Sequence, residues 1–254
     1  RMAAKGLFAK TLYDMDLSFH DVAAIRSVLA VPGFALLAWL YRSKATTERD
    51  STSRRNDLLL ALFAGFLCYY LGALANFYAL TIVDASVERP LLFAYPLFVV
   101  IITTVITRHP PSGRVLLALL LTTLGVVLVT GALNARLSVS QWSGMAWILF
   151  CSLSIAVYTL ISGELTHRLG SGLFTFSAMT AAAVGMAVHY QIVAGWESVD
   201  ISVTVWWTLA ALVVFSTVLP LSLMAEGVRR IGASQGSLIS TLGPPATAIM
   251  AQEL

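Results

Sequence analysis

Charged residues are scarce in this sequence. Asp, Glu, Lys and Arg make up 11% of its 254 residues, whereas hydrophobic residues make up 58% and the mean hydropathy is +0.82. A soluble domain of this length buries its core beneath a charged surface, and this composition supplies too little charge for one. The shortage excludes a soluble globular protein and indicates a protein of the lipid bilayer.

Cysteine and clusters of metal ligands are also in short supply. The two cysteines, Cys68 and Cys151, both lie within apolar runs, so we expect buried free thiols rather than a disulfide or a metal site. The sequence contains no Walker loop, no metal-ligand spacing and no Cys-His cluster. We therefore predict no cofactor, no bound metal and no ATP-driven step.

Apolar runs of about 20 residues, the length of a membrane-spanning helix, fill most of the chain. They fall at 19–41, 58–80, 85–107, 115–133, 144–165, 172–194, 204–227 and 233–252, after a short helical piece near 2–13. Short polar connections separate them, and no soluble domain interrupts them. The pattern predicts an all-α polytopic membrane protein with about eight or nine spans in this chain.

Basic residues are distributed unevenly between alternate connections. One set holds ten Lys and Arg residues, whereas the other holds only Arg136 beside several acidic residues. The ten are Arg42, Lys44, Arg49, Arg54, Arg55, Arg108, Arg114, Arg168, Arg229 and Arg230. Because basic residues accumulate on the cytoplasmic side, we predict a multi-pass protein of the cell (inner or plasma) membrane with this set inside. The same asymmetry explains the net charge of +3 better than a nucleic-acid partner does.

An internal repeat relates residues near 80–96 to residues near 228–244, at an offset of 148. The matching positions are Ala85-Ser86 with Ala233-Ser234, and Pro96 with Pro244. The connection before the first copy carries Asp84 and lies outside, while the connection before the second carries Arg229 and Arg230 and lies inside. The two copies are therefore predicted to be inverted, as in many secondary transporters.

These residues resemble a known family. The stretch ALTIVDASVERPLLFAYPL at 79–97, with RIGAS at 230–234 and STLGP at 240–244, is similar to EamA-type permeases of the drug/metabolite transporter superfamily. The resemblance implies ten helices in two inverted five-helix repeats around a central cavity. We place the repeats at 1–133 and 134–254, and expect the chain to lack the start of helix one and all of helix ten.

The resemblance implies a secondary transporter of small organic metabolites, such as amino acids or related compounds, that works by alternating access and is not an enzyme. A nucleotide-sugar or sugar-phosphate carrier is the first alternative. A non-transporting scaffold and an intramembrane serine hydrolase are more remote ones. The expected partners are a small-molecule substrate, the bilayer and a coupling proton or other ion, with the oligomeric state left open.

Charged residues inside the spans are candidates for the substrate pathway. Arg26 lies about two turns inside the run at 19–41, where a charge costs roughly 2.5–3.5 kcal/mol unless it finds water or a partner. It either contacts a substrate carboxylate or gate, or is a structural arginine at the outer interface that pairs with Asp21. Glu88 and Arg89 open the run at 85–107.

Glu88 permits two interpretations. A carboxylate in the first helical turn after Ser86 is stabilised by the helix dipole, which is a structural role. Glu88 is also seven residues before Tyr95 and shares its helix face, which would let the carboxylate line the pathway and titrate in proton coupling. We keep both roles open.

Uncharged polar residues inside spans complete the candidate set. They are Tyr69, Asn76, Tyr158 and Gln235, each of which needs a partner in an apolar surrounding. Neighbouring serines and threonines are more readily explained by helix-to-helix hydrogen bonds of about 0.6 kcal/mol. Prolines within spans permit flexing, so the hinge candidates are Pro96, Pro220, Pro244 and Pro245.

One enzyme motif is present by letter alone. Residues 232–236 fit G-x-S-x-G, the expression for a hydrolase nucleophile with Ser234 as the reactive residue and His189 as its base. That motif requires a strand before the serine, whereas a basic connection and a membrane helix surround it here. We interpret the two glycines as a G-x-x-x-G packing face instead.

Overall fold

The computed structural model describes residues 19–40, 51–83, 88, 91–130, 139–193 and 203–240. Regular structure within these ranges is entirely helical. The elements are α2 (Phe19–Leu40), α3 (Ser51–Gly65), η1 (Phe66–Gly72), α4 (Ala73–Leu80), α6 (Tyr95–Thr107), α7 (Gly113–Thr130), α8 (Val139–Leu169), α9 (Ser171–Val193), α10 (Val203–Ala211), η2 (Leu212–Val218), α11 (Leu219–Ile231) and α12 (Ala233–Ser240). The predicted pieces near 2–13 and 241–252 lie outside the described residues.

The helices follow the apolar runs of the sequence. Four of the described helices are long and apolar enough to cross a membrane, namely Thr52–Leu80, Gln141–Leu169, Ser171–Val193 and Trp206–Ile231. Shorter apolar helices cover Ala24–Leu40, Tyr95–Thr107 and Gly113–Gly125. The predicted all-α polytopic membrane fold is confirmed.

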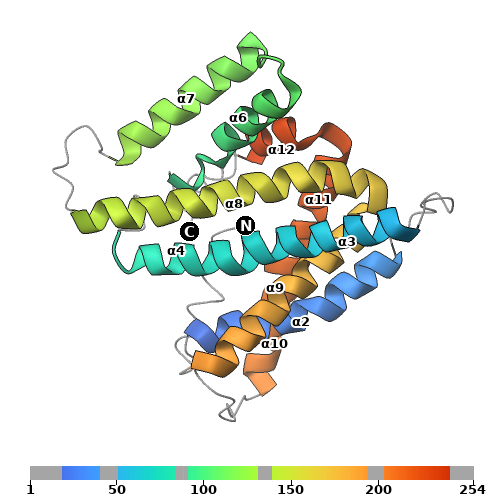
Figure 1. The fold of residues 1–254 in the computed structure, drawn as a ribbon. Coiled ribbons are helices and arrows are strands. Elements are labelled where there is room, and N and C mark those ends of the chain that lie inside the picture. Colours follow the sequence, from blue (N-terminus) through green and yellow to red (C-terminus); the bar gives the residue numbers. More distant parts are fainter. Residues whose placement is uncertain are drawn as a thin grey trace, which may run out of the picture.

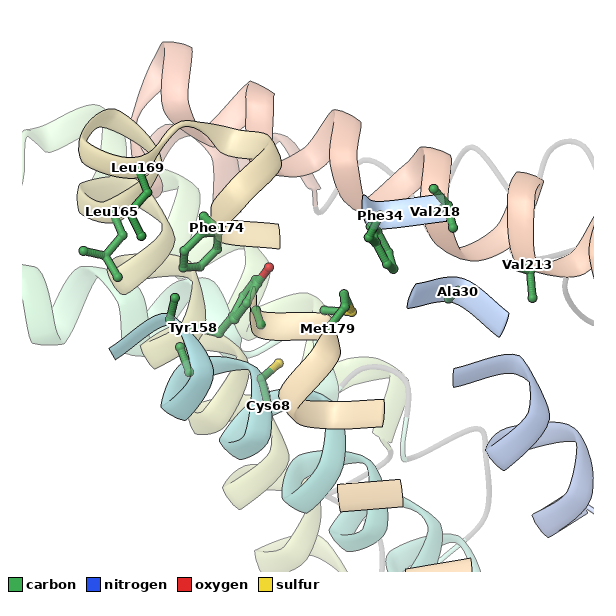
Figure 2. Close-up of a cluster of buried hydrophobic side chains, with 13 residues drawn as sticks. Ala30, Phe34, Cys68, Tyr158, Leu165, Leu169, Phe174, Met179, Val213 and Val218 are labelled. Atoms are coloured by element: carbon green, nitrogen blue, oxygen red, sulfur yellow. The ribbon is translucent and has the colours of Figure 1, made fainter. Parts of the chain in front are cut away.

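Helix α8 is the centre of the bundle. It packs against α3, η1, α4, α6, α9, α11 and α12, and Figure 1 shows it crossing the middle of the molecule with α3 and α4 alongside. The main buried cluster includes Tyr158 of α8, Cys68 of η1 and Phe174 of α9 (Figure 2). Phe34 of α2 and Val218 of η2 belong to the same cluster, so it joins early and late parts of the chain.

Helices α3 and α9 cross with their backbones in close approach. A Cβ atom placed on Gly65 would lie 2.0 Å from the carbonyl oxygen of Ala178, so only glycine fits there. Ala61 and Ala64, on the same helix, are fully buried. Small residues at such crossings are typical of membrane bundles, because close approach increases van der Waals contact.

Single glycines form two of the connections. Gly170 joins α8 to α9 and Gly232 joins α11 to α12, and both have φ of 83°. Residues with a Cβ rarely adopt this conformation, which explains glycine at the end of each helix. Each connection therefore makes a helical hairpin with almost no loop.

Two spans contain seven-residue π-helical segments, η1 and η2. Their first residues, Phe66 and Leu212, are 146 positions apart, close to the 148-residue offset of the sequence repeat. Segment η2 ends just before Pro220, which has no N–H to donate to an earlier carbonyl. Since π-helical turns are rare and often mark functional sites, their matching positions single out these two spans.

Helix α7 stands apart from the rest of the described bundle. Its principal contact is with α6, and Figure 1 shows it outside the other helices. Its exposed apolar side chains are Leu116, Leu117, Leu120, Leu121 and Leu124. A surface of this composition is suited to contact with lipid or with another membrane helix.

Candidate functional site

The span at 85–107 is interrupted part-way. Helix α6 begins at Tyr95, after a turn at Phe93 and Ala94 in which the Ala94 N–H donates to the Leu91 carbonyl oxygen at 3.0 Å. Pro96 occupies the first turn of α6, where a missing N–H costs no helical hydrogen bond. The hinge candidate Pro96 thus lies at the start of a helix rather than within one.

Glu88 lies before this break and is buried, with 6% of its surface exposed. Its carboxylate is close enough to the thiol of Cys151 on α8 for the two to interact electrostatically. Among the residues that the structure describes, no hydrogen bond or ion pair reaches the carboxylate. An ionised carboxylate is costly to bury without a partner. Nothing in the described part of the chain compensates this cost for Glu88.

Two tyrosines from different spans meet at the main buried cluster. Tyr69 of η1 and Tyr158 of α8 pack edge to face, with ring centroids 4.9 Å apart. Tyr158 also contacts Phe174 of α9, at 5.5 Å between centroids, and Figure 2 shows it between Phe174 and Cys68. The structure therefore brings together two of the predicted tyrosines from different parts of the chain.

Asn76 continues the same surface of the span Thr52–Leu80. One turn earlier, Gly72 packs so closely on α8 that an added Cβ would lie 3.4 Å from the Cβ of Ser154 and 3.7 Å from the Sγ of Cys151. Residues four apart share a helix face, so Asn76 lies on the side that approaches α8. Its buried side-chain oxygen has no hydrogen-bond partner in the described structure.

Tyr95 links two helices that carry the copies of the sequence repeat. Its hydroxyl donates to the backbone oxygen of Ser237 at 3.3 Å, which joins α6 to α12. Both residues are buried. The structure places Tyr95 in the interior, as the sequence predicts, with its hydroxyl turned toward the second copy.

The remaining candidates lie elsewhere. Arg26 is half-buried on α2, which packs mainly against α9 and η2 rather than α8. Gln235 is exposed on α12, and Pro220 lies at the start of α11. Arg89, Pro244 and Pro245 fall outside the described residues. Of the candidates, the structure brings Tyr69 and Tyr158 into contact, with Cys68 in the same buried cluster.

Hydroxyl groups along α8 are mostly satisfied by their own helix. Ser154 and Thr159 donate to the carbonyl oxygens of Phe150 and Ile155, at 2.9 and 2.8 Å. Such bonds to the carbonyl four residues earlier leave the hydroxyl little capacity for a solute or another helix. Ser162 differs, because its buried oxygen has no partner among the described residues.

Ion pairs at helix ends next to the basic connections are contacts that the sequence did not predict. Arg168 of α8 pairs with Glu164 one turn earlier and with Asp57 of α3, at 3.4 Å. On α11, Glu226 accepts from Arg229 and Arg230, at 2.8 Å from each Nε, and from the hydroxyl of Ser171 on α9 at 2.8 Å. A lone Asp57 in a basic stretch is the signal that could have suggested the first pair.

The hydrolase alternative finds no support in the geometry. Ser234 is on α12 next to the Gly232 turn, whereas His189 is eighteen residues from the start of α9, about 27 Å along that helix. The His189 ring lies against Tyr70, with Nδ1 3.5 Å from the phenol oxygen. No strand precedes Ser234 in the described chain, so the nucleophile-elbow context is missing.

Comparison with known proteins decides the family. The sequence matches the EamA-like transporter family twice, over residues 2–131 and 142–252. The chain belongs to the EamA-like transporter family. It is also 35% identical over 246 residues to the "Uncharacterized transporter YcbK" of Bacillus subtilis (strain 168), an alignment that covers 95% of this chain and 78% of the relative.

Membership in this family agrees with the observed fold. The protein is a multi-pass integral protein of the cell membrane, and it is a membrane transporter. The predicted resemblance to EamA-type permeases is confirmed. The family matches begin and end near the predicted repeats at 1–133 and 134–254, whose boundaries stay a prediction.

Proposed function

We propose that this EamA-family protein is a secondary carrier of small organic metabolites, such as amino acids or related compounds, that works by alternating access. The observation that supports this most directly is Glu88, a carboxylate with 6% exposure and no hydrogen bond or ion pair in the described structure. Buried ionisable residues inside membrane helices commonly mark substrate or ion pathways.

The position of Glu88 fits such a pathway. It lies in an interrupted span, before the break, and broken helices of this kind form the binding sites of many transporters because their backbone polar groups face the solute. The Tyr69–Tyr158 contact and the unpaired oxygen of Asn76 in the described structure are polar and aromatic groups from two other spans. We assign these residues to the substrate pathway, with a proton or another cation as the coupling ion.

Alternating access requires two arrangements of the same helices. The two family matches, the π-helical segments 146 residues apart and the Tyr95–Ser237 bond between the repeat copies support two related halves. We propose that these halves are inverted repeats that move relative to each other. An enzyme function has no comparable support.

Transport by the complete gene product in proteoliposomes tests this proposal. Labelled amino acids and related metabolites are offered in uptake and efflux, for the unchanged protein, for Glu88→Gln, and for Glu164→Gln as a matched exposed control. We expect saturable flux that falls at least tenfold in Glu88→Gln and stays close to normal in Glu164→Gln. Absence of flux for every compound, with protein shown to be folded, would contradict the proposal.

A further inference from the structure

The crossing of α3 and α9 at Gly65 divides the span Thr52–Leu80 into two parts. Residues 51–65, here called the α3 arm, lie before the crossing, and η1 and α4 lie beyond it. Asp57 is eight residues before Gly65, about 12 Å along α3, and Ser171 is seven residues before Ala178, about 10 Å along α9. The two parts of the span are held by different kinds of contact.

Beyond the crossing, aromatic rings hold the span against α9. A Cβ atom placed on Gly185 of α9 would lie 2.9 Å from Cγ of Tyr70 and 3.0 Å from Cε2 of Phe66, both on η1. The two rings also pack on each other, with centroids 4.8 Å apart. Separating such closely packed apolar surfaces would leave a void and forfeit their van der Waals contacts. We therefore expect η1 to stay on α9.

Before the crossing, an ion pair holds the α3 arm. Nη1 of Arg168 lies 3.4 Å from Oδ1 of Asp57, and Figure 1 shows the end of α8 beside the start of α3. The Arg168 side chain is partly exposed, and ion pairs that water can reach are weak. Arg168 also pairs with Glu164 on its own helix, so the guanidinium keeps a partner when Asp57 moves away. This contact can be broken and remade at little cost.

The helix changes its geometry at the crossing. Segment η1 begins at Phe66, directly after Gly65. Helices commonly kink at π-helical turns, so the α3 arm can change direction here while η1 keeps its place. A rotation of about 15° about Gly65 would move Asp57 by about 3 Å, enough to break its contact with Arg168.

We propose that the α3 arm turns about its crossing with α9 at Gly65, and that the Asp57–Arg168 ion pair is a latch that holds the arm in the conformation described. The inference rests on the proposed carrier function, which requires two arrangements of the same helices, and it names one part that moves. The alternative is a permanent contact that stabilises the fold and stays closed throughout transport.

Cysteine accessibility tests the movement without requiring transport. Ala61 lies on the α3 arm and is fully buried, so Ala61→Cys reports on opening of the arm. The complete gene product is used with its own cysteines, Cys68 and Cys151 included, changed to alanine. The readout is the rate of alkylation by N-ethylmaleimide. We expect Asp57→Asn to raise this rate at least threefold.

Controls separate opening of the arm from general loosening. Arg230→Gln removes an ion pair on α11 instead and should leave the rate at Ala61→Cys unchanged. Ala75→Cys, buried on α4 beyond the crossing, should show no rise in Asp57→Asn. If Ala61→Cys does not fold, Leu58→Cys on the same arm, a half-buried position packed against the main cluster, replaces it as reporter.

Reversible cross-linking tests the role of the latch in transport. Asp57→Cys and Arg168→Cys are joined by a bifunctional methanethiosulfonate, through disulfides that dithiothreitol cleaves. We expect flux of the best labelled solute in proteoliposomes to fall at least tenfold and to recover with dithiothreitol. Ser171→Cys and Glu226→Cys, joined in the same way between α9 and α11, are the matched control. Both helices belong to one family match, so flux should change less than twofold.

The outcomes separate the two proposals. If folded protein transports no solute while Asp57→Asn still exposes the reporter at Ala61, the carrier function fails and the movement of the α3 arm stands. If solutes are transported and the cross-link between positions 57 and 168 leaves flux unchanged, the carrier function stands and the latch is wrong. An unchanged reporter in Asp57→Asn, or equal rises at Ala61 and Ala75, would also overturn the latch.

Discussion

Arg168, at the end of α8, places Nη1 3.4 Å from Oδ1 of Asp57 near the start of α3, across 111 residues of sequence. The side chain of Asp57 is only 9% exposed, whereas that of Arg168 is 39% exposed and also pairs with Glu164. The contact ties together the ends of two spans that belong to different family matches.

Removing this tie should lower the stability of the protein. In Asp57→Asn the guanidinium keeps Glu164 but loses the negative charge that it faces on α3, so we expect a lower melting temperature in detergent. The double variant with Arg168→Gln should lose less stability than the sum of the two single losses, because both single changes remove the same Asp57–Arg168 ion pair. Melting temperatures that fall additively would show that the two residues act independently.

The crossing of α3 and α9 should tolerate no side chain at Gly65. Gly65→Ala places a methyl group against the Ala178 carbonyl oxygen, and overpacking of this kind costs about 1–3 kcal/mol. Gly227→Ala is the matched control, because no atom lies within 4 Å of its Cβ position and alanine favours helix by about 1 kcal/mol. The melting temperature should fall in Gly65→Ala and rise in Gly227→Ala. Equal shifts in the two variants would contradict the close crossing of α3 and α9.

The Tyr95 hydroxyl should affect the rate of transport more than the stability of the protein. Tyr95→Phe removes the bond to the Ser237 carbonyl oxygen, a contact worth about 0.6 kcal/mol in membranes. If the bond holds α6 against α12 in one state, its loss should speed exchange between states by about threefold. The measurement is maximal flux in proteoliposomes, with Tyr78→Phe on the exposed side of α4 as control. Flux unchanged in Tyr95→Phe would remove the bond from the transport cycle.

Pro220, which lies where η2 passes into α11, should be needed for fast turnover. Pro220→Ala restores a backbone N–H beside the π-helical segment, so we expect a more regular and more stable helix with slower turnover. Pro96→Ala is its counterpart in the first turn of α6, where no donor is required, and should change both properties little. Equal effects of the two substitutions on melting and flux would argue against a hinge at η2.

The spans were predictable from sequence because apolar length alone decides what crosses a bilayer. The run at 172–194, for example, is observed as Ser171–Val193. The π-helical segments were not predictable, since one extra residue per turn depends on packing and leaves no clear mark in apolar periodicity.

Contacts between distant residues were the harder part of the site. Tyr69 and Tyr158 were both candidates, yet only the fold shows that their rings meet, because the contact depends on how η1 crosses α8. Arg26 was a candidate for the same reason as Glu88, a charge within a span, but α2 places it against other helices. The energetic cost of a charge within a span identifies such residues from the sequence. Which residues surround them depends on how the helices pack, which the sequence alone does not show.

The single-residue connections at Gly170 and Gly232 bear on how the protein enters the membrane during synthesis. With one residue between α8 and α9, neither helix can settle in the bilayer far from the other, so the pair is expected to insert as a unit and bury its shared face at once. Insertion as a pair keeps the hydroxyl-bearing side of α8 away from lipid. It also means that few partly inserted states are exposed while the chain is still attached to the ribosome.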